Sequence, residues 1–484
     1  MNTYLLTHEI LVLALGLALL LADLWAPASL RGKFGHLAAL GLGGILLYSI
    51  FQVPVPAADA STAFGGMFVL DSLALFFKRF FILAAILVLL ISVEFSDHFK
   101  AGASEFYALI LFALTGMLLA ASANDFSLLF VSLELITISF YILTSFQRSR
   151  VDSLEAGVKY LIIGALSTGF TVFGIALVSG ISGHFNFNQI AAVALEHREN
   201  PIFLFGLLLI LGGLGFKIAA VPFQIWAPDV YQGGPTPAVA FLAIGSKAAG
   251  FVLLLRFLFI AVPEVAANWS TLIMMISGAT ILYGNLCAIP QRNLKRLLGY
   301  SSISHAGYLL LGISALTHAG QAAVLYYLGG YLFTVLAAFI VICLVLRQLE
   351  TDDISGLAGL NQRSPLLATT MTLSMVSLAG IPPLAGFFGK FLLLKSVIEQ
   401  AGTNSHYWCL AGVAIIGVVI SFYYYFGVIR AIYWSEEAPD LTPIPISLPA
   451  RLAIYICLAG MFFLGMFPAP MVDLAACAVR ALKP

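Results

Sequence analysis

The chain has 484 residues, of which 61% are hydrophobic and only 10% are charged. Soluble domains carry about 25% charged residues, so this composition excludes a soluble fold and indicates a polytopic membrane protein. The 23 basic and 23 acidic residues give no net charge, which argues against a nucleic acid as partner.

The apolar segments predict an all-α protein that crosses the membrane many times. The first of them, ILVLALGLALLLADLW, has no basic stretch before it and no small-residue cleavage site after it, so we expect a retained helix. A spanning helix needs about 20 largely apolar residues. By that rule we expect about 14 spans, roughly at 5–25, 36–54, 70–93, 105–122, 125–146, 155–180, 201–222, 236–262, 270–289, 296–316, 321–347, 365–400, 408–433 and 447–470.

The basic residues of the loops predict how the helices are oriented. One set of alternating loops carries twelve of them, namely Arg31, Lys33, Lys100, Arg148, Arg150, Arg292, Lys295, Arg296, Arg347, Arg363, Arg430 and Arg451. The other set carries three, namely Arg198, Arg480 and Lys483. Because cytoplasmic loops are the basic ones, both termini are expected outside.

Eight further basic residues fall within the expected spans. We expect Lys78, Arg79 and Arg256 to lie near helix ends and to extend their charges to the lipid headgroups. For Lys395 this explanation and a functional one are equally good. Lys159 lies one turn after Glu155, so either an ion pair within the helix or a functional role is open.

Four ionisable residues lie in the middle of spans: Glu134, Lys217, Lys247 and Lys390. Each costs about 2.5–3.5 kcal/mol to place at the bilayer centre, so a use for them is expected. Burial removes the hydration that stabilises an ammonium, and a nearby carboxylate restores that stabilisation. A lysine whose carboxylate partner can approach or withdraw is therefore a switchable proton site, and Glu134 could be such a partner for Lys217.

Two of these lysines lie beside expected helix breaks. Pro222 follows Lys217 by five residues, and Pro382 and Pro383 precede Lys390. Proline removes a backbone donor and clashes with the preceding turn. Such breaks are tolerated at membrane depth where the backbone is buried in protein or faces a wet cavity.

The spacing of these residues predicts an internal duplication. Lys217 and Lys390 are 173 residues apart, and Glu134 and His305 are 171 apart. A unit of five helices is odd in number, so its second copy would be inverted, as in many transporters. Proline and glycine are also common in ordinary membrane helices, which is the simpler explanation of the two breaks.

We expect N-terminal helices at 1–100, a first repeat at 101–265, an inverted second repeat at 266–435 and a C-terminal helix at 436–484. His305 is either a helix–helix hydrogen-bonding residue or a proton relay between Lys247 and Lys390.

The segments GLGFKIAAVPFQIWAPDVYQGGPTP, SKAAG, NLKRLLGYSSISHAGY and SLAGIPPLAGFFGKF resemble the antiporter-like membrane subunits of proton-pumping NADH:quinone oxidoreductase, respiratory complex I. The stretch WAPDVYQGGPTP is more similar to the N branch of these subunits than to the L and M branches. The resemblance implies roles in proton translocation for Glu134, Lys217, Lys247, His305 and Lys390, and it matches Lys159 to a further lysine of this branch.

The resemblance also implies what the chain works with. NAD, FMN, iron–sulfur clusters and quinone are expected on partner subunits, and no cofactor is expected on this chain, whose five cysteines are scattered. The partners are expected to be the lipid bilayer and other membrane and peripheral subunits of the complex, and the location is expected to be the inner (plasma) membrane of the cell. A component of a multi-subunit cation/proton antiporter with the same fold is the alternative.

Overall fold

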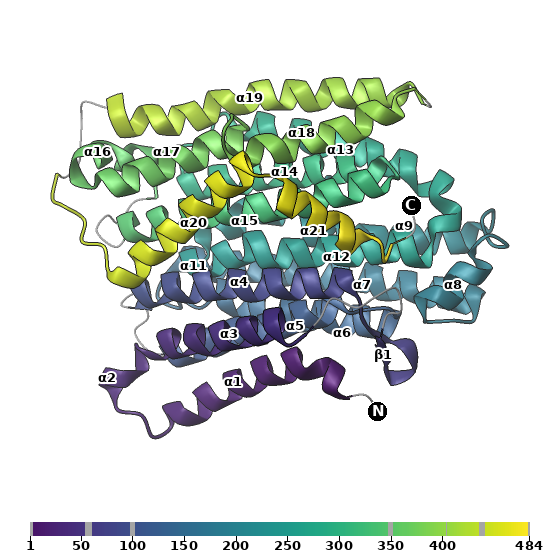
Figure 1. The fold of residues 1–484 in the computed structure, drawn as a ribbon, viewed down its shortest axis with the longest axis horizontal. Helices are drawn as coiled ribbons and strands as arrows, with labels where there is room; N and C mark the ends of the chain where they lie inside the picture. The colour runs from purple at the N-terminus through teal and green to yellow at the C-terminus, as the bar shows by residue number, and fades with distance from the viewer. Residues whose placement is uncertain are drawn as a thin grey trace.

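The structure is a computed structural model, and it describes residues 3–53, 61–96, 102–346, 352–402, 404–434 and 441–482. The described chain is a bundle of helices that run roughly parallel to one long axis (Figure 1). Its only described sheet pairs two short antiparallel strands, β1 (Ser61–Ala63) and β2 (Phe68–Leu70). Lys100, Arg347 and Lys483, which contribute to the orientation prediction, lie outside the described residues.

The helices have the following bounds. The first part of the chain forms α1 (Thr7–Asp23), α2 (Ala28–Arg31), α3 (Phe34–Phe51), α4 (Ser72–Glu94), α5 (Ala103–Ala121), α6 (Phe126–Thr144), α7 (Val151–Ser182) and α8 (Phe187–Ala194). The middle part forms α9 (Pro201–Ile218), α10 (Trp226–Gly233), α11 (Thr236–Phe241), α12 (Lys247–Arg256), α13 (Ala266–Ala288), α14 (Leu294–Ser314) and α15 (His318–Leu346). The last part forms α16 (Leu360–Arg363), α17 (Pro365–Ala379), α18 (Ala385–Gln400), α19 (His406–Trp434), α20 (Leu448–Met466) and α21 (Ala469–Val479).

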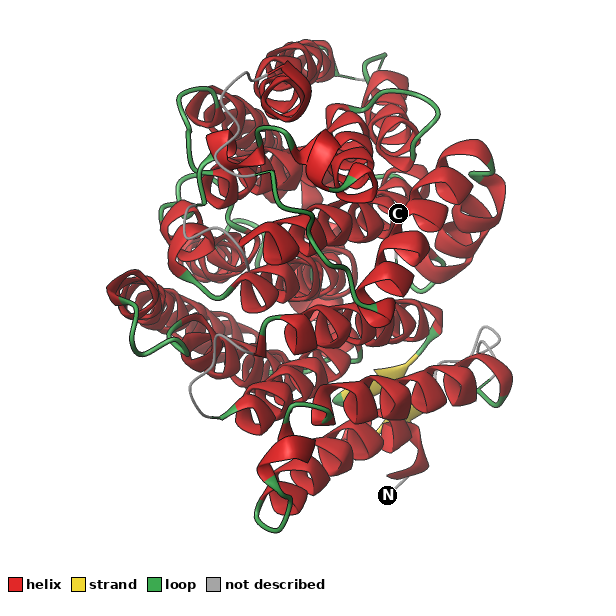
Figure 2. Ribbon diagram, turned by 90° about the vertical axis from the view of Figure 1, so that its left-hand side faces the viewer, coloured by secondary structure: helices red, strands yellow, loops and turns green. Residues whose placement is uncertain are grey.

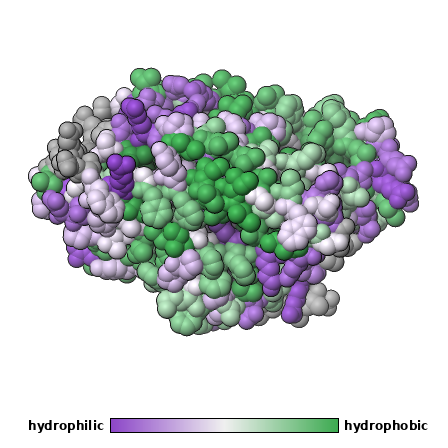
Figure 3. All heavy atoms as spheres, turned by 90° about the horizontal axis from the view of Figure 1, so that it is seen from above, coloured by the Kyte–Doolittle hydropathy of each residue, from purple (hydrophilic) through white to green (hydrophobic). Residues whose placement is uncertain are grey.

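The surface has the pattern of a membrane protein. Among the described residues, 12 helices are long and apolar enough to cross a bilayer. Figure 3 shows apolar residues gathered across the middle of one face and polar residues toward its two ends. Large apolar side chains such as Leu40, Val158 and Val419 are exposed by more than half on the outer helices, as expected where lipid replaces water.

Two of the expected spans fall outside these 12 helices, for different reasons. The span expected at 296–316 corresponds to α14, whose 21 residues include several serines, a histidine and two basic residues. Nearly all of α14 is buried among other helices, so its surface need not be apolar. The span expected at 365–400 is divided between α17 and α18, each too short to cross alone.

The last expected span, at 447–470, corresponds to α20, and a shorter apolar helix follows it. Helix α20 ends at Met466, and α21 begins three residues later, after Phe467 and Pro468. Figure 1 shows α20 and α21 following one another along the bundle, with the described N-terminal and C-terminal ends toward the same end of it.

Both expected helix breaks are present. Helix α9 ends at Ile218, where Ala219 takes the left-handed conformation with φ of 57°, and α10 begins at Trp226. Helix α17 ends at Ala379, where Gly380 has φ of 89°, and α18 begins at Ala385. A left-handed residue after the last turn is a common helix end, because it turns the chain away from the axis.

A long, buried helical segment lies inside the bundle. Residues Thr236–Ala261 form one continuous, largely apolar segment, of which all residues except the partly exposed Ile260 are buried. It contains two π-helical stretches, Leu242–Ser246 and Phe257–Ala261, and the first ends immediately before Lys247. Figure 2 looks along the helices and shows how others surround the interior ones. Single-turn π segments are frequent at functional sites.

The second break depends on a glycine. A Cβ atom on Gly386 would lie 1.8 Å from the backbone oxygen of Ser377, so α17 and α18 meet too closely for any side chain there. We expect Gly386→Ala to destabilise the fold by at least about 1–3 kcal/mol. The measurement is the amount of assembled protein in membranes. Gly412→Ala is the matched control, because a Cβ there meets nothing within 4 Å; equal accumulation of both variants would contradict the packing argument.

Candidate functional site

The buried ionisable residues lie on separate helices in the interior. Lys217 on α9, Lys247 on α12, His305 on α14 and Lys390 on α18 are exposed by 4%, 4%, 2% and 8%. Glu134 on α6 is half-buried and lines a hollow of about 710 Å³ between α6 and α7.

Lys217 lies in the last turn of α9, beside the first break. Its Nζ donates a hydrogen bond of 2.9 Å to Thr137 Oγ1 on α6. The indole nitrogen of Trp226, at the start of α10, donates to the backbone oxygen of Phe216 at 3.0 Å, which also accepts from the amide of Ala219, and so ties α10 to the end of α9. A cation at a helix C-terminus is stabilised by the helix dipole, which is a reason for an ammonium to lie there.

Glu134 and Lys217 lie near one another without direct contact. Glu134 Oε1 accepts a hydrogen bond of 2.7 Å from Thr168 on α7. Thr137, the partner of Lys217, is one turn after Glu134 on the same helix. No ion pair links the two described residues, so the structure holds the carboxylate and the ammonium on two different threonines.

Lys247 joins the first half of the chain to the second. Its Nζ donates to the backbone oxygen of Ser302 at 2.5 Å and also contacts the Ser302 hydroxyl. That hydroxyl is 2.8 Å from the hydroxyl of Tyr231 on α10. Ser302 therefore connects α12, α14 and the second half of the first broken helix.

His305 lies one turn beyond Ser302 on α14, and both of its ring nitrogens contact tyrosines. Nδ1 contacts the hydroxyl of Tyr327 on α15, and Nε2 is 3.0 Å from the hydroxyl of Tyr425 on α19. The Tyr425 hydroxyl is in turn 2.5 Å from Ser301 Oγ, next to Ser302. An imidazole with a partner on each nitrogen can receive a proton on one side and release it on the other.

Lys390 occupies the second break. The backbone amides of Gly380 and Ile381 donate hydrogen bonds to the backbone oxygens of Val376 and Ser377. The backbone oxygens of the last two residues of α17 therefore receive no hydrogen bond from a described backbone amide. The Nζ of Lys390 donates to these two, Leu378 at 2.7 Å and Ala379 at 3.1 Å. It also lies 5.1 Å from the ring centre of Tyr308 on α14, at a distance typical of a cation–π contact.

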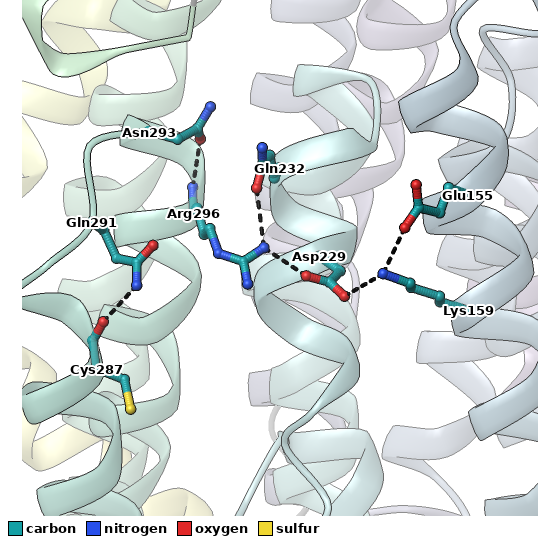
Figure 4. Close-up of polar contacts among 8 residues, drawn as sticks. All are labelled: Glu155, Lys159, Asp229, Gln232, Cys287, Gln291, Asn293 and Arg296. Carbon is teal, nitrogen blue, oxygen red and sulfur yellow. Dashed lines mark hydrogen bonds and ion pairs between the residues drawn. The ribbon is translucent and has the colours of Figure 1, made fainter.

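Lys159 lies apart from this chain of groups. It pairs with Glu155 at 2.7 Å and with Asp229 at 2.8 Å, and its side chain is 42% exposed. Arg296 holds the other oxygen of Asp229 at 2.6 Å and also donates to Gln232 (Figure 4). Burial raises the pKa of the Asp229 carboxyl, but the hydrogen bonds from Lys159 and Arg296 outweigh it, so the pKa lies below its ordinary value. The network ties α7, α10 and α14 together.

Replacing Lys159, at one side of this network, and Asp229, at its centre, is expected to have unequal effects. Lys159→Gln removes a partly exposed ion pair, so we expect a loss of stability of at most about 1 kcal/mol. Asp229→Asn removes the carboxylate that holds two cations, and we expect a loss of stability of about 1.5–3 kcal/mol. Thermal unfolding of the purified protein measures both losses, and an equal or larger loss for Lys159→Gln would contradict the central role of Asp229.

The expected positions of Lys78 and Arg256 near the headgroups were wrong. Lys78 is fully buried and pairs with Glu9 at 2.8 Å, while Arg256 is fully buried and pairs with Asp71 at 2.7 Å. The reason is that the helix faces that carry them point into the bundle. Arg79 is half-buried and donates to the backbone oxygens of Ser49 and Val53 at the end of α3, and Lys395 is exposed.

The hydroxyl groups of the site were not predicted from the sequence. These are Thr137, Thr168, Tyr231, Ser301, Ser302, Tyr327 and Tyr425. Two of them had a signal, because Thr137 and Ser302 each lie three residues from an ionisable residue on the same helix. In the described part of the chain no three His, Cys, Asp or Glu side chains gather in a way that could hold a metal ion.

Comparison with known proteins gives consistent matches. Residues 123–421 match the family described as NADH:quinone oxidoreductase/Mrp antiporter, transmembrane. The chain is 38% identical over 480 residues to NADH-quinone oxidoreductase subunit N of Desulforamulus reducens, covering 99% of this chain and 98% of that one. It is 40% identical over 474 residues to subunit N of Moorella thermoacetica, with 98% of each covered.

Solved structures have the same fold. A chain of respiratory complex I from Thermus thermophilus is 32% identical, with a TM-score of 0.79 over 97% of this chain and all of that one. A chain of the Mrp complex from Dietzia is 21% identical, with a TM-score of 0.80 over 98% of this chain and 97% of that one, which shows a shared fold alone.

Proposed function

Because the chain belongs to the subunit N branch of the NADH:quinone oxidoreductase/Mrp antiporter transmembrane family, we propose that it carries protons across the membrane along its buried ionisable residues. It is a multi-pass membrane subunit of NADH-quinone oxidoreductase, and the relay is the proposed part. NAD, FMN, iron–sulfur clusters and quinone are bound by partner subunits in this proposal, and their reaction supplies the energy.

One observation carries the proposal. Four almost fully buried groups, Lys217, Lys247, His305 and Lys390, lie on four helices of one chain, and hydroxyls or free helix carbonyls contact each of them. Purely structural lysines would be expected to have carboxylate partners, because an uncompensated buried charge is costly. These three lysines hydrogen-bond to neutral oxygens in the described structure, which leaves them free to exist with or without the proton.

The first step concerns Glu134 and Lys217. When Glu134 turns toward Lys217, the ammonium keeps its proton; when it turns toward Thr168, as here, only the Thr137 hydroxyl holds the amine. The proton can then leave for Lys247. Glu134 borders the open hollow between α6 and α7, where a neighbouring subunit could act on its charge.

The second step crosses from the first half of the chain to the second. Lys247 hands its proton toward Ser302. The neighbouring residue in the chain, Ser301, hydrogen-bonds through its hydroxyl to Tyr425, and Tyr425 contacts His305, so these hydroxyls carry the proton onward in this proposal. Lys390 is the last site, where the carbonyls at the end of α17 and the ring of Tyr308 stabilise its ammonium. Lys159 we assign as a positioning residue that fixes α7 to α10 through Asp229.

The energies are compatible with this sequence of steps. Moving one charge across 100 mV requires about 2.3 kcal/mol. Leaving one partner of a buried ion pair alone costs about 3–5 kcal/mol. Opening or closing the Glu134–Lys217 pair can therefore drive one proton against such a potential.

We further propose that the chain contains an internal duplication and has a defined orientation in the membrane. Residues 101–265 and 266–435 form two inverted repeats within about 14 spans, between the helices of 1–100 and the end of the chain at 436–484, and both termini face outward. The two breaks support this, since each adjoins a lysine and the lysines are 173 residues apart.

The test of the function is carried out on the purified complex in sealed vesicles. A redox-driven proton carrier takes up protons when NADH and quinone are supplied, and an imposed sodium gradient without NADH moves none. Proton movement driven by the sodium gradient alone would instead favour the cation/proton antiporter.

A further inference from the structure

A second buried cluster of ionisable groups lies in the N-terminal helices, away from the proposed relay. His8 and Glu9, in the first turn of α1, are exposed by 1% and 4%, and Lys78 on α4 is fully buried. Lys78 Nζ lies 2.8 Å from Glu9 Oε1 and 4.7 Å from the ring centre of Phe68.

The polar atoms of this cluster lack hydrogen-bond partners. Within the described residues, both ring nitrogens of His8, both oxygens of Glu9 and Nζ of Lys78 accept or donate no well-aligned hydrogen bond. Native interiors seldom leave such atoms unpaired, and a site with several unpaired polar atoms is where buried water is found. The ion pair alone therefore does not account for the cluster.

The charged and titratable groups around the cluster have partners of their own. Arg256 on α12 and Asp71 at the start of α4 form a bidentate pair, with Arg256 also bound to the backbone oxygen of Ala121. Arg79 is occupied by backbone oxygens at the end of α3, and the ring of Tyr48 on α3 lies 6.1 Å from that of His8. These are the charged and titratable neighbours of the cluster in the described structure.

We propose that His8, Glu9 and Lys78 form a hydrated proton-binding site that exchanges protons with the side of the membrane on which the termini lie. Three features support this. The site lies in the first turn of α1, toward the end of the bundle where the described ends of the chain lie. Its unpaired atoms can bind bridging water, and its carboxylate, ammonium and imidazole can share one proton. Asp71 and Arg256 are paired with each other, so we assign them a structural role beside the site and not a part in binding the proton.

The site is independent of the proposed relay, and so is its test. Infrared difference spectra of the purified complex between acidic and neutral pH record carboxyl groups that gain a proton. We expect a carboxylic acid signal that is lost in Glu9→Gln and altered in His8→Phe. The matched control is Glu399→Gln, which removes the carboxylate of the exposed Lys395–Glu399 pair and should leave that signal unchanged.

A second variant keeps the test decisive if Glu9→Gln does not assemble. Glu9→Leu combined with Lys78→Met removes both charges together and leaves none unpaired, so it should assemble and lack the signal. An unchanged signal in either assembled variant would overturn the proposal and leave a sealed structural ion pair.

Discussion

Replacing Lys217 with alanine is expected to lower NADH-driven proton uptake about 100-fold, the lower end of what a positioned proton-transfer group contributes. Lys217 is almost fully buried, and its amine is held by one threonine hydroxyl. No other described basic side chain contacts Thr137, so none can take its place. The measurement is proton uptake by sealed vesicles, with the amount of assembled complex determined separately.

A second substitution separates proton transfer from charge. Lys217→Arg keeps a positive charge but arginine does not release its proton in proteins, so uptake should stay low. If Lys217 only supplied charge, Lys217→Arg would restore pumping, and that result would remove it from the relay. Glu134→Gln should also lower uptake, because the amide cannot attract the ammonium of Lys217.

Replacing Asp71 with asparagine is expected to prevent stable assembly. The guanidinium of Arg256 is fully buried, and Asp71 accepts two hydrogen bonds from it, at 2.7 and 3.1 Å. Losing that carboxylate leaves a buried charge alone, at a cost of about 3–5 kcal/mol. Asparagine can still cap α4 through the hydrogen bond from the Ala74 amide, so the effect reports the charge.

The rescue experiment completes this prediction. Asp71→Asn combined with Arg256→Met removes both charges, and replacing a buried ion pair by apolar groups is often neutral. We expect the double variant to assemble where the single one does not. A single variant that accumulates like the unchanged protein would show that Arg256 has another counterion or reaches water.

The sequence predicted the broken helices and the residues beside them for physical reasons. Proline at 222 and at 382–383 cannot continue a helix, and a lysine near such a break has backbone oxygens or water within reach. The structure adds which oxygens: those of Leu378 and Ala379 for Lys390, and the Thr137 hydroxyl for Lys217.

The remaining features depend on which way a helix faces, and a single sequence does not contain that information. Lys78 and Arg256 lie at depths from which a side chain can reach the headgroups, yet their helix faces point inward to Glu9 and Asp71. Similarly, α14 corresponds to the span predicted at 296–316 but is not among the 12 described helices that are long and apolar enough to cross a bilayer, because other helices rather than lipid surround it. The contact between Ser302 and Lys247 joins residues 55 positions apart, so it could be found only from the three-dimensional structure.

The number of protons moved for each NADH oxidised tests the relay most directly. It should be measured in vesicles that contain fully assembled complex with Lys247→Ala, since Lys247 is the only described lysine that contacts Ser302 and so links the two halves of the chain. We predict either fewer protons moved for each NADH oxidised than in the unchanged complex, or a complex in which proton uptake and NADH oxidation stop together. An unchanged ratio at an unchanged rate would contradict proton transfer through these lysines.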